Sequence, residues 1–366
     1  MPGTPRQYYM DMLKGAAIYM VVMGHVLTLC IGEINDTLLF RIIGEIHMPL
    51  FFFISGWFTF KRHSDGTPFR TPDLWQRTLQ LLVPMVIVSS IWIFVFRHSG
   101  LQCQFDSTWR GLWTATYKNG YWFPLCLFEI MLIYAATSYL FRRIPAMTSI
   151  GLVFTVWALL MTVSQKLAGT TICNAAELEL VTRFYPVFMA GAIARMYEKR
   201  FLAYVHRPRV YTAALAASGF LLYMICYFRK FGISDEWLDI VRIIFHITLA
   251  TAAIPIACGQ TSRTDAGLSR TVRFWTYLGR ESLAIYLLHY LFLFPMEWLR
   301  APLRDMGLGF VPAAVTAGIA AAAIIGCVLA ANAIISRSPL LAMLLTGKTQ
   351  RASKSTRLKF TTLNNI

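Results

Sequence analysis

The residue types best suited to chemistry lie in one apolar stretch, residues 8–25, which reads YYMDMLKGAAIYMVVMGH. Asp11 and Lys14 stand near its start, and His25 stands at its end behind a run of apolar side chains. In a helix, Lys14 and His25 fall within about 20° of one face and roughly 16 Å apart along the axis. A neutral imidazole, with an ordinary pKa of about 6.5, accepts a proton from a hydroxyl group at neutral pH. We therefore interpret His25 as a general base or a transient acyl acceptor, with a purely structural histidine as the alternative.

The next apolar stretch adds three ionisable residues, Arg41, Glu45 and His47. Ionisable side chains are expensive inside a membrane, and they usually mark a functional site. Their presence near the depth of His25 favours a catalytic role over a histidine that only hydrogen-bonds across helices. We predict that His47 or Glu45 orients His25 or stabilises charge during the reaction. Pro49 predicts a kink in the helix that opens the backbone near Glu45. The opened backbone lines a cavity, or the kink serves only helix packing.

A basic residue near the start of the first stretch is suited to binding phosphate groups. Lys14 lies at the predicted membrane surface, and Arg70 and Arg77 follow in the next loop on the same side. We predict that these three cations, with Asp11 on the Lys14 face, bind the phosphates of a cytosolic donor. Two alternatives stay open. Asp11 and Lys14 form a local ion pair that anchors the helix, or the basic loop lies on anionic lipid.

The composition indicates a polytopic membrane protein. Of the 366 residues, 57% are hydrophobic and 14% are charged, whereas a soluble domain averages about 25% charged residues. Basic cytoplasmic loops explain the formal charge of +16, so we expect no nucleic-acid partner. The seven cysteines show no CxxC spacing, and we expect no metal site. Cys103 and Cys173 lie in predicted outer loops, which leaves a disulfide between them open.

The hydropathy pattern predicts an all-α integral membrane fold of about ten transmembrane helices in one bundle. Alternate loops hold 23 of the 34 Lys and Arg residues, which predicts that both termini are cytoplasmic. Residues 1–335 form one transmembrane domain on this interpretation, and residues 336–366 form a basic cytoplasmic tail. The predicted spans are 14–31, 38–60, 79–96, 121–140, 148–165, 180–197, 210–228, 240–258, 277–294 and 310–335.

Four motifs resemble those of the membrane-bound acyltransferase 3 family. YMDMLKG at residues 9–15, followed by His25, is similar to its opening motif, where ten residues separate a basic residue from a histidine. HMPLFFFISG at 47–56 resembles its second-span signature, and YWF at 121–123 resembles a short aromatic motif. LGRESLAIYLLH at 278–289 resembles a late motif of the family. The matches follow in order along most of the chain.

This resemblance implies acyl transfer in a bacterial inner membrane, from a cytosolic acyl-CoA to a hydroxyl of an envelope glycan or glycolipid. It implies that His25 is the essential catalytic residue and that Lys14 is a second essential position. Lys14 stands where arginine is commoner, so it meets phosphate as a point charge instead of a bidentate fork. Acetyl-CoA and succinyl-CoA both fit as donors, while the acceptor and the oligomeric state stay open.

The main rival hypothesis is a multi-span transporter or flippase of a glycan or lipid. In such a protein the intramembrane ionisable residues relay protons or line a substrate path. A sensor or scaffold is a third class, in which His25 is replaceable without chemical consequence. Consumption of acyl-CoA by the purified protein separates the first hypothesis from the other two.

Overall fold

The described part of the chain is helical. Within it there is no strand, which confirms the all-α prediction. The computed structural model describes residues 7–31, 38–60, 73–96, 109–141, 146–232, 234–262, 269–294, 296 and 309–348.

Long helices build the bundle, and short helices and single turns connect them. The longer ones are α1 (Tyr8–His25), α2 (Leu38–Thr59), α4 (Val83–Phe96), α6 (Trp122–Phe141), α7 (Ala146–Lys166), α9 (Leu178–Met196), α11 (Pro208–Cys226), α12 (Asp235–Ser262), α13 (Arg270–Arg280) and α16 (Phe310–Ile335). The shorter ones are α3 (Leu74–Arg77), α5 (Trp109–Thr114), α8 (Thr171–Ala175), α10 (Glu198–Val205), α14 (Ser282–Leu288) and α17 (Pro339–Thr346). The remaining turns are the π-helices η1 (Val26–Ile31) and η2 (Thr78–Leu82) and the 3₁₀ segments η4 (Thr116–Gly120), η5 (Phe228–Phe231) and η6 (His289–Phe292).

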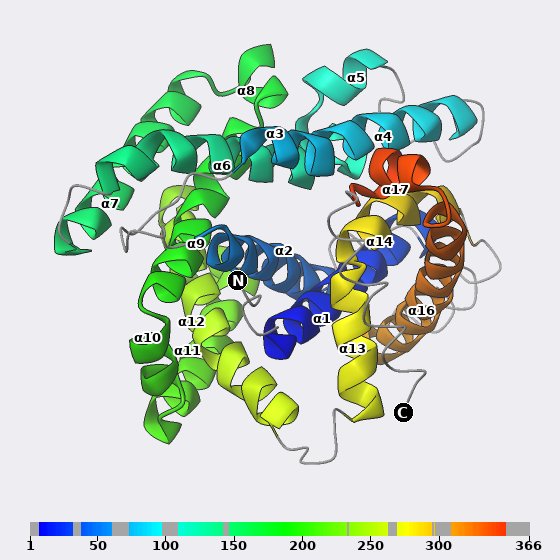
Figure 1. Ribbon diagram of the computed structural model, residues 1–366. Coiled ribbons are helices and arrows are strands. Elements are labelled where there is room, and N and C mark those ends of the chain that lie inside the picture. The colour runs from blue at the N-terminus through cyan, green and yellow to red at the C-terminus, as the bar shows by residue number, and fades with distance from the viewer. Residues whose placement is uncertain are drawn as a thin grey trace, which may run out of the picture.

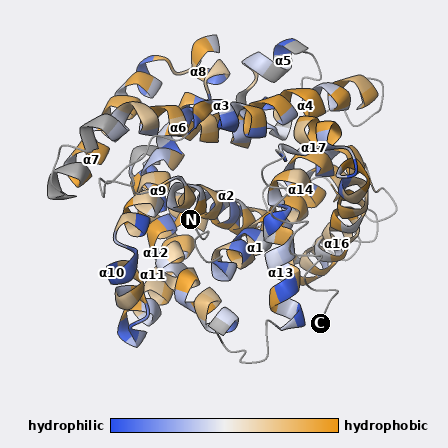
Figure 2. Cartoon of the chain, viewed as in Figure 1, coloured by the Kyte–Doolittle hydropathy of each residue, from blue (hydrophilic) through white to orange (hydrophobic). Residues whose placement is uncertain are grey.

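Helix α1 lies in the middle of the molecule, between two groups of helices (Figure 1). It packs against α2 and α13 and also contacts α12, α14 and α16, while α2 packs against α9. Helices α3 and α4 follow each other end to end beside this centre, and α6 lies next to α3 (Figure 1). Hydrophobic residues cover most helices (Figure 2), and large ones such as Phe154 and Ile319 are exposed. Apolar outer faces are expected of helices that lie in lipid.

All ten predicted spans coincide with helical segments, and the ninth is broken at Glu281, between α13 and α14. Six helices of the described chain are long and apolar enough to cross a membrane, and the number of crossings and the side of the termini stay predictions. These six are Tyr8–Ile31, Leu38–Thr59, Leu74–Val95, Pro208–Cys226, Trp237–Thr261 and Phe310–Ile335. Shorter apolar helices are Trp122–Ser138, Ile150–Lys166 and Ser282–Phe292.

The start of the predicted tail is part of the folded bundle. Helix α17 is apolar and packs against α4 and α14. Just after it, the Lys348 ammonium lies 2.6 Å from a Glu281 carboxylate oxygen, which also accepts a hydrogen bond of 2.7 Å from the Asn332 side chain. The chain after α17 is therefore fastened to the break between α13 and α14. Residues 349–366 lie outside the described residues.

Two close helix crossings fix the centre of the bundle. At the crossing of α1 and α13, a Cβ at Gly15 would collide with the Trp275 carbonyl oxygen, and a Cβ at Gly279 would collide with that of Asp11. Helices α2 and α9 meet in the same way, at Gly56 and Gly191. Small residues let helix backbones approach this closely in a membrane, where no hydrophobic force drives the helices together.

We expect Gly279→Ala to lower the melting temperature of the protein, because overpacking a tight contact costs about 1–3 kcal/mol. Gly326 on α16 provides the matched control, since nothing lies within 4 Å of its Cβ position. Gly326→Ala should leave stability unchanged or raise it by up to about 1 kcal/mol. Thermal unfolding of the detergent-solubilised protein, followed by tryptophan fluorescence, measures both. Equal melting temperatures for the two variants would contradict the close crossing.

Candidate active site

His25 is the last residue of α1, and the helix continues beyond it as the π-helix η1. Helix α1 holds Lys14 and His25 in one unbroken α-helix, as the sequence predicts. A π-helical turn widens the backbone spiral, and such turns are frequent at functional sites. The His25 side chain is half-buried.

The crossing of α1 with α13 brings a second histidine to the same depth. Counting from that crossing, His25 lies ten residues after Gly15, and His289 lies ten residues after Gly279. His25 is thus about 15 Å along α1 from the crossing. His289 lies beyond the break at Glu281, at the start of η6. His25 Nδ1 lies 2.8 Å from His289 Nε2, and the two rings are stacked. The neighbouring Tyr290 places its hydroxyl 2.9 Å from His25 Nε2.

The hydrogen-bond partners assign a tautomer to each ring. His289 Nδ1 lies 3.0 Å from the Ile285 carbonyl oxygen, which only accepts, so Nδ1 carries the proton. Nε2 of the neutral His289 ring therefore accepts from His25, and His25 carries its proton on Nδ1. The lone pair of His25 Nε2 is left to accept the Tyr290 hydroxyl proton. An imidazole held in this way is a base with its reactive nitrogen already oriented.

An aromatic wall holds Tyr290 in place. Its ring centroid lies 4.9 Å from that of Tyr121, and its hydroxyl lies where a side chain at Gly120 would be. Gly120 has a φ of +91°, a conformation that favours glycine. The Tyr286 hydroxyl donates to the Gly120 carbonyl oxygen at 2.6 Å and accepts from the Phe123 amide at 3.3 Å. The aromatic motif at 121–123 is therefore part of the wall beside His25.

A buried ion pair fastens the turn that carries Gly120. The Lys118 ammonium, fully buried, lies 3.3 Å from a Glu177 oxygen and donates to the Ala115 and Asn174 carbonyl oxygens. Lys118 and Glu177 both have a left-handed φ, a strained backbone state that persists only where surrounding contacts enforce it. Burial raises the pKa of the Glu177 carboxyl, and the Lys118 charge opposes that rise.

The structure gives His25 partners other than the two that the sequence predicts. His47 donates its Nδ1 proton to the Ile43 carbonyl oxygen within α2. Glu45 faces α12, where it pairs with Arg242 and His246. The orienting contacts of His25 come instead from His289 and Tyr290. Catalytic roles for His47 and Glu45 stay predictions.

The predicted donor residues lie on separate elements. The Lys14 ammonium lies 4.5 Å from the centroid of the Phe58 ring on α2. The Asp11 side chain is buried on α1, beside the crossing with α13. Arg77 ends α3 and donates to the Gln80 side chain at 3.2 Å. Arg70 lies outside the described residues.

The described residues offer no metal site and no bridge at Cys173. Within them, no group of three or more His, Cys, Asp or Glu side chains is arranged to hold a metal ion. Cys173 is a buried free cysteine, and Cys103 lies outside the described ranges.

The sequence marks His289 only as the last residue of a motif, and it does not mark Tyr290. His289 stands out as a buried ionisable residue at the end of the LGRESLAIYLLH motif. Its contact with His25 depends on the crossing of α1 and α13, which hydropathy does not reveal. Tyr290 carries no signal beyond its position next to that histidine.

The helical membrane fold with a histidine site agrees with the comparison with known proteins. Residues 7–332 match the family model described as "Acyltransferase domain". The chain therefore belongs to this acyltransferase family, which confirms the resemblance.

A curated relative adds a shorter match. Nodulation protein NolL of Sinorhizobium fredii is 38% identical over 88 residues. That match covers 22% of this chain and 23% of the relative. No solved structure gives a significant match to the chain.

We expect His289→Phe to change the tautomer of His25, because phenylalanine offers no acceptor for the Nδ1 proton. His25 should then carry its proton on Nε2, with the Tyr290 hydroxyl as acceptor. His289→Gln supplies an acceptor oxygen and should retain the original tautomer. Nitrogen-15 NMR of ring-labelled histidines, with His25→Gln to assign the signal, measures this. An Nε2-protonated His25 in the unmodified protein would contradict the assignment.

Proposed function

We propose that the chain is a membrane O-acyltransferase that moves an acyl group from acyl-CoA to a hydroxyl of an envelope glycan or glycolipid. The observation that carries this proposal is the oriented lone pair of His25 Nε2 inside an apolar bundle. A base of this kind activates a hydroxyl group. Membership of the acyltransferase family supports acyl transfer as the reaction.

In the proposed reaction the acceptor hydroxyl replaces the Tyr290 hydroxyl at His25 Nε2. Its proton moves to Nε2 while its oxygen attacks the thioester carbonyl carbon. The new C–O bond forms, the C–S bond of the donor breaks, and the imidazolium returns the proton to the departing thiolate. The displaced Tyr290 hydroxyl is close enough to donate to the oxyanion that develops on the carbonyl oxygen.

The donor is proposed to enter from the cytoplasmic end of α1. Lys14 and Arg77, with Arg70, are the candidates for contact with its phosphates, and Asp11 is a further candidate for contact with the donor. Lys14 and His25 are separated by roughly 16 Å along the helix, which an extended pantetheine arm spans. Acetyl-CoA and succinyl-CoA both suit this arrangement.

The proposed location is the bacterial cytoplasmic membrane, with the acceptor in its outer half. The distribution of basic residues along the chain supports this orientation. His47 and Glu45 are the candidates on α2 for contact with the acceptor or for stabilising the charge that develops during the reaction.

We expect His25→Gln to slow acyl transfer by at least about 100-fold, since a positioned base contributes that much. His206→Gln is the matched control, because it makes the same substitution at an exposed histidine whose Nδ1 bonds the Leu202 carbonyl oxygen. Release of CoA thiol by the purified protein measures turnover, and mass spectrometry of envelope glycans from expressing cells measures the product.

His206→Gln should behave as the unmodified protein in both assays. Full glycan acylation by His25→Gln, at a normal protein level in the membrane, would overturn the proposal. An unmodified protein that leaves every acyl-CoA intact would favour the transporter hypothesis.

A further inference from the structure

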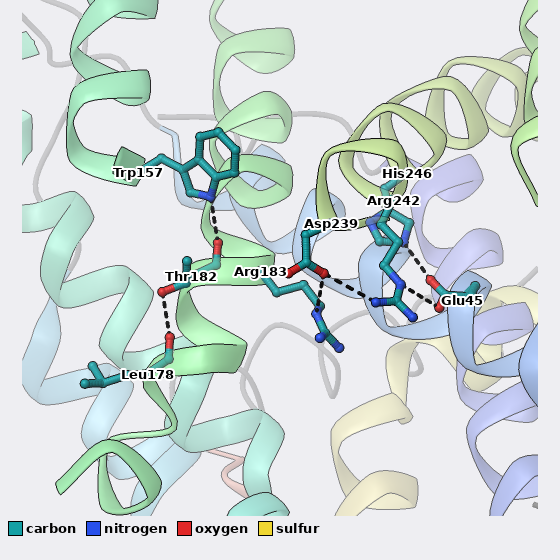
Figure 3. A network of polar contacts seen from close by, with 8 residues as sticks. All are labelled: Glu45, Trp157, Leu178, Thr182, Arg183, Asp239, Arg242 and His246. Carbon is teal, nitrogen blue, oxygen red and sulfur yellow. Dashed lines mark hydrogen bonds and ion pairs between the residues drawn. The ribbon is translucent and has the colours of Figure 1, made fainter. Parts of the chain in front are cut away.

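A second polar site lies between α2, α9 and α12 (Figure 3). We call it the outer polar cluster, and Figure 3 shows its side chains turned toward one another. Within it, Arg242 Nε lies 2.9 Å from a Glu45 oxygen, and Arg242 Nη1 lies 3.3 Å from an Asp239 oxygen. The cluster consists of Glu45, Arg183, Asp239, Arg242 and His246.

The outer polar cluster lies near the depth of His25. At the contact of α1 with α2, a Cβ at Gly24 would be 3.3 Å from the Ile43 side chain. His25 is one residue beyond Gly24, and Glu45 is two residues beyond Ile43. At the helical rise per residue, His25 and Glu45 are within about 5 Å of each other along the helix axes. The Glu45 end of the cluster and His25 are therefore at a similar depth in the bundle.

Within the cluster, Arg242 is well paired and Arg183 is not. Arg242 lies between two carboxylates, Glu45 and Asp239, and the Glu45 carboxylate is also shared with His246 at 3.5 Å. Arg183 reaches only Asp239 among the described residues, at 3.6 Å and through Nε. Its two terminal nitrogens point away from Asp239 (Figure 3).

Arg183 is also accessible, with 33% of its side chain exposed. A guanidinium stays charged at every relevant pH, and a charge within a membrane-spanning segment is expensive unless it is paired. Its two terminal nitrogens form a planar pair of donors that matches a carboxylate or phosphate group.

We propose that Arg183 binds a carboxylate or phosphate group carried by the acceptor glycan or glycolipid. The Asp239–Arg242–Glu45 pairs hold the Arg183 guanidinium in position, and the bound anion places a neighbouring hydroxyl of the acceptor at His25. This inference rests on the proposed function, and it adds the chemical class of the acceptor. The preferred acceptor is an acidic sugar or a sugar phosphate instead of a neutral one.

The test compares two probes that differ in one group, hexyl glucuronide, which carries a carboxylate, and hexyl glucoside, which does not. Binding of each to the purified protein in nanodiscs of zwitterionic lipid is measured by calorimetry, without acyl-CoA. We expect the unmodified protein to bind the glucuronide at least about tenfold more tightly, in line with a charge-assisted bidentate pair. Arg183→Gln should abolish this preference, and Arg183→Lys should retain part of it.

Arg207→Gln is the matched control, because it removes an exposed arginine at the start of α11 and should keep the preference. The ratio of the two affinities does not depend on the fraction of protein that is folded. An Arg183→Gln variant with an unchanged ratio would show that Arg183 only fastens helices, and it would overturn the proposal.

A second arm of the experiment separates the acceptor from lipid. In nanodiscs that contain phosphatidylglycerol the preference for the glucuronide should persist. Its loss there would mean that a lipid phosphate occupies Arg183, which also overturns the proposal. Because no acyl-CoA is present, failure of the acyltransferase hypothesis would not affect this result, and His25→Gln should keep the binding preference.

Discussion

The contact between the α1 and α13 backbones, at Gly15 and Gly279, is the constraint on which the site depends. It sets the relative depth of the two helices, and a histidine follows ten residues after each of the two glycines. A shift of one residue in this crossing would move His25 by about 1.5 Å relative to His289. That shift is about half the 2.8 Å between His25 Nδ1 and His289 Nε2. The hydrogen bond that orients His25 therefore depends on the close packing of α1 against α13.

Two kinds of polar contact occur at similar depths in the bundle. Around His25 the contacts are neutral hydrogen bonds, from His289 and Tyr290, which end at the Ile285 carbonyl oxygen. On the α12 side of α2 the contacts are ion pairs. Neutral hydrogen bonds leave the His25 imidazole able to take up a proton. Ion pairs instead provide fixed charges that recognise a charged group. This separation suits a site where an acceptor is bound in one place and activated in another.

The sequence predicts the helical membrane fold and the position of His25, because both depend on residue type and local spacing. An ionisable side chain within an apolar helix is conspicuous before any contact is known. Its partners are not predictable in this way, since they depend on the face that each helix turns toward its neighbours. Glu45 shows this: it follows His25 closely in sequence, yet its face of α2 meets α12. Helix α17 shows that an apolar octapeptide can join the bundle after the last long helix.

Sidedness tests the central claim most directly, namely that α1 links a cytosolic acyl donor to an acceptor in the outer half of the membrane. Acetyl-CoA labelled in its acetyl group is added outside inverted membrane vesicles, whose cytoplasmic face is outermost, and outside right-side-out vesicles. We expect labelled glycan within the inverted vesicles only, and none when His25 is replaced by Gln. Equal labelling of both vesicle types, or labelling that does not need His25, would contradict the claim.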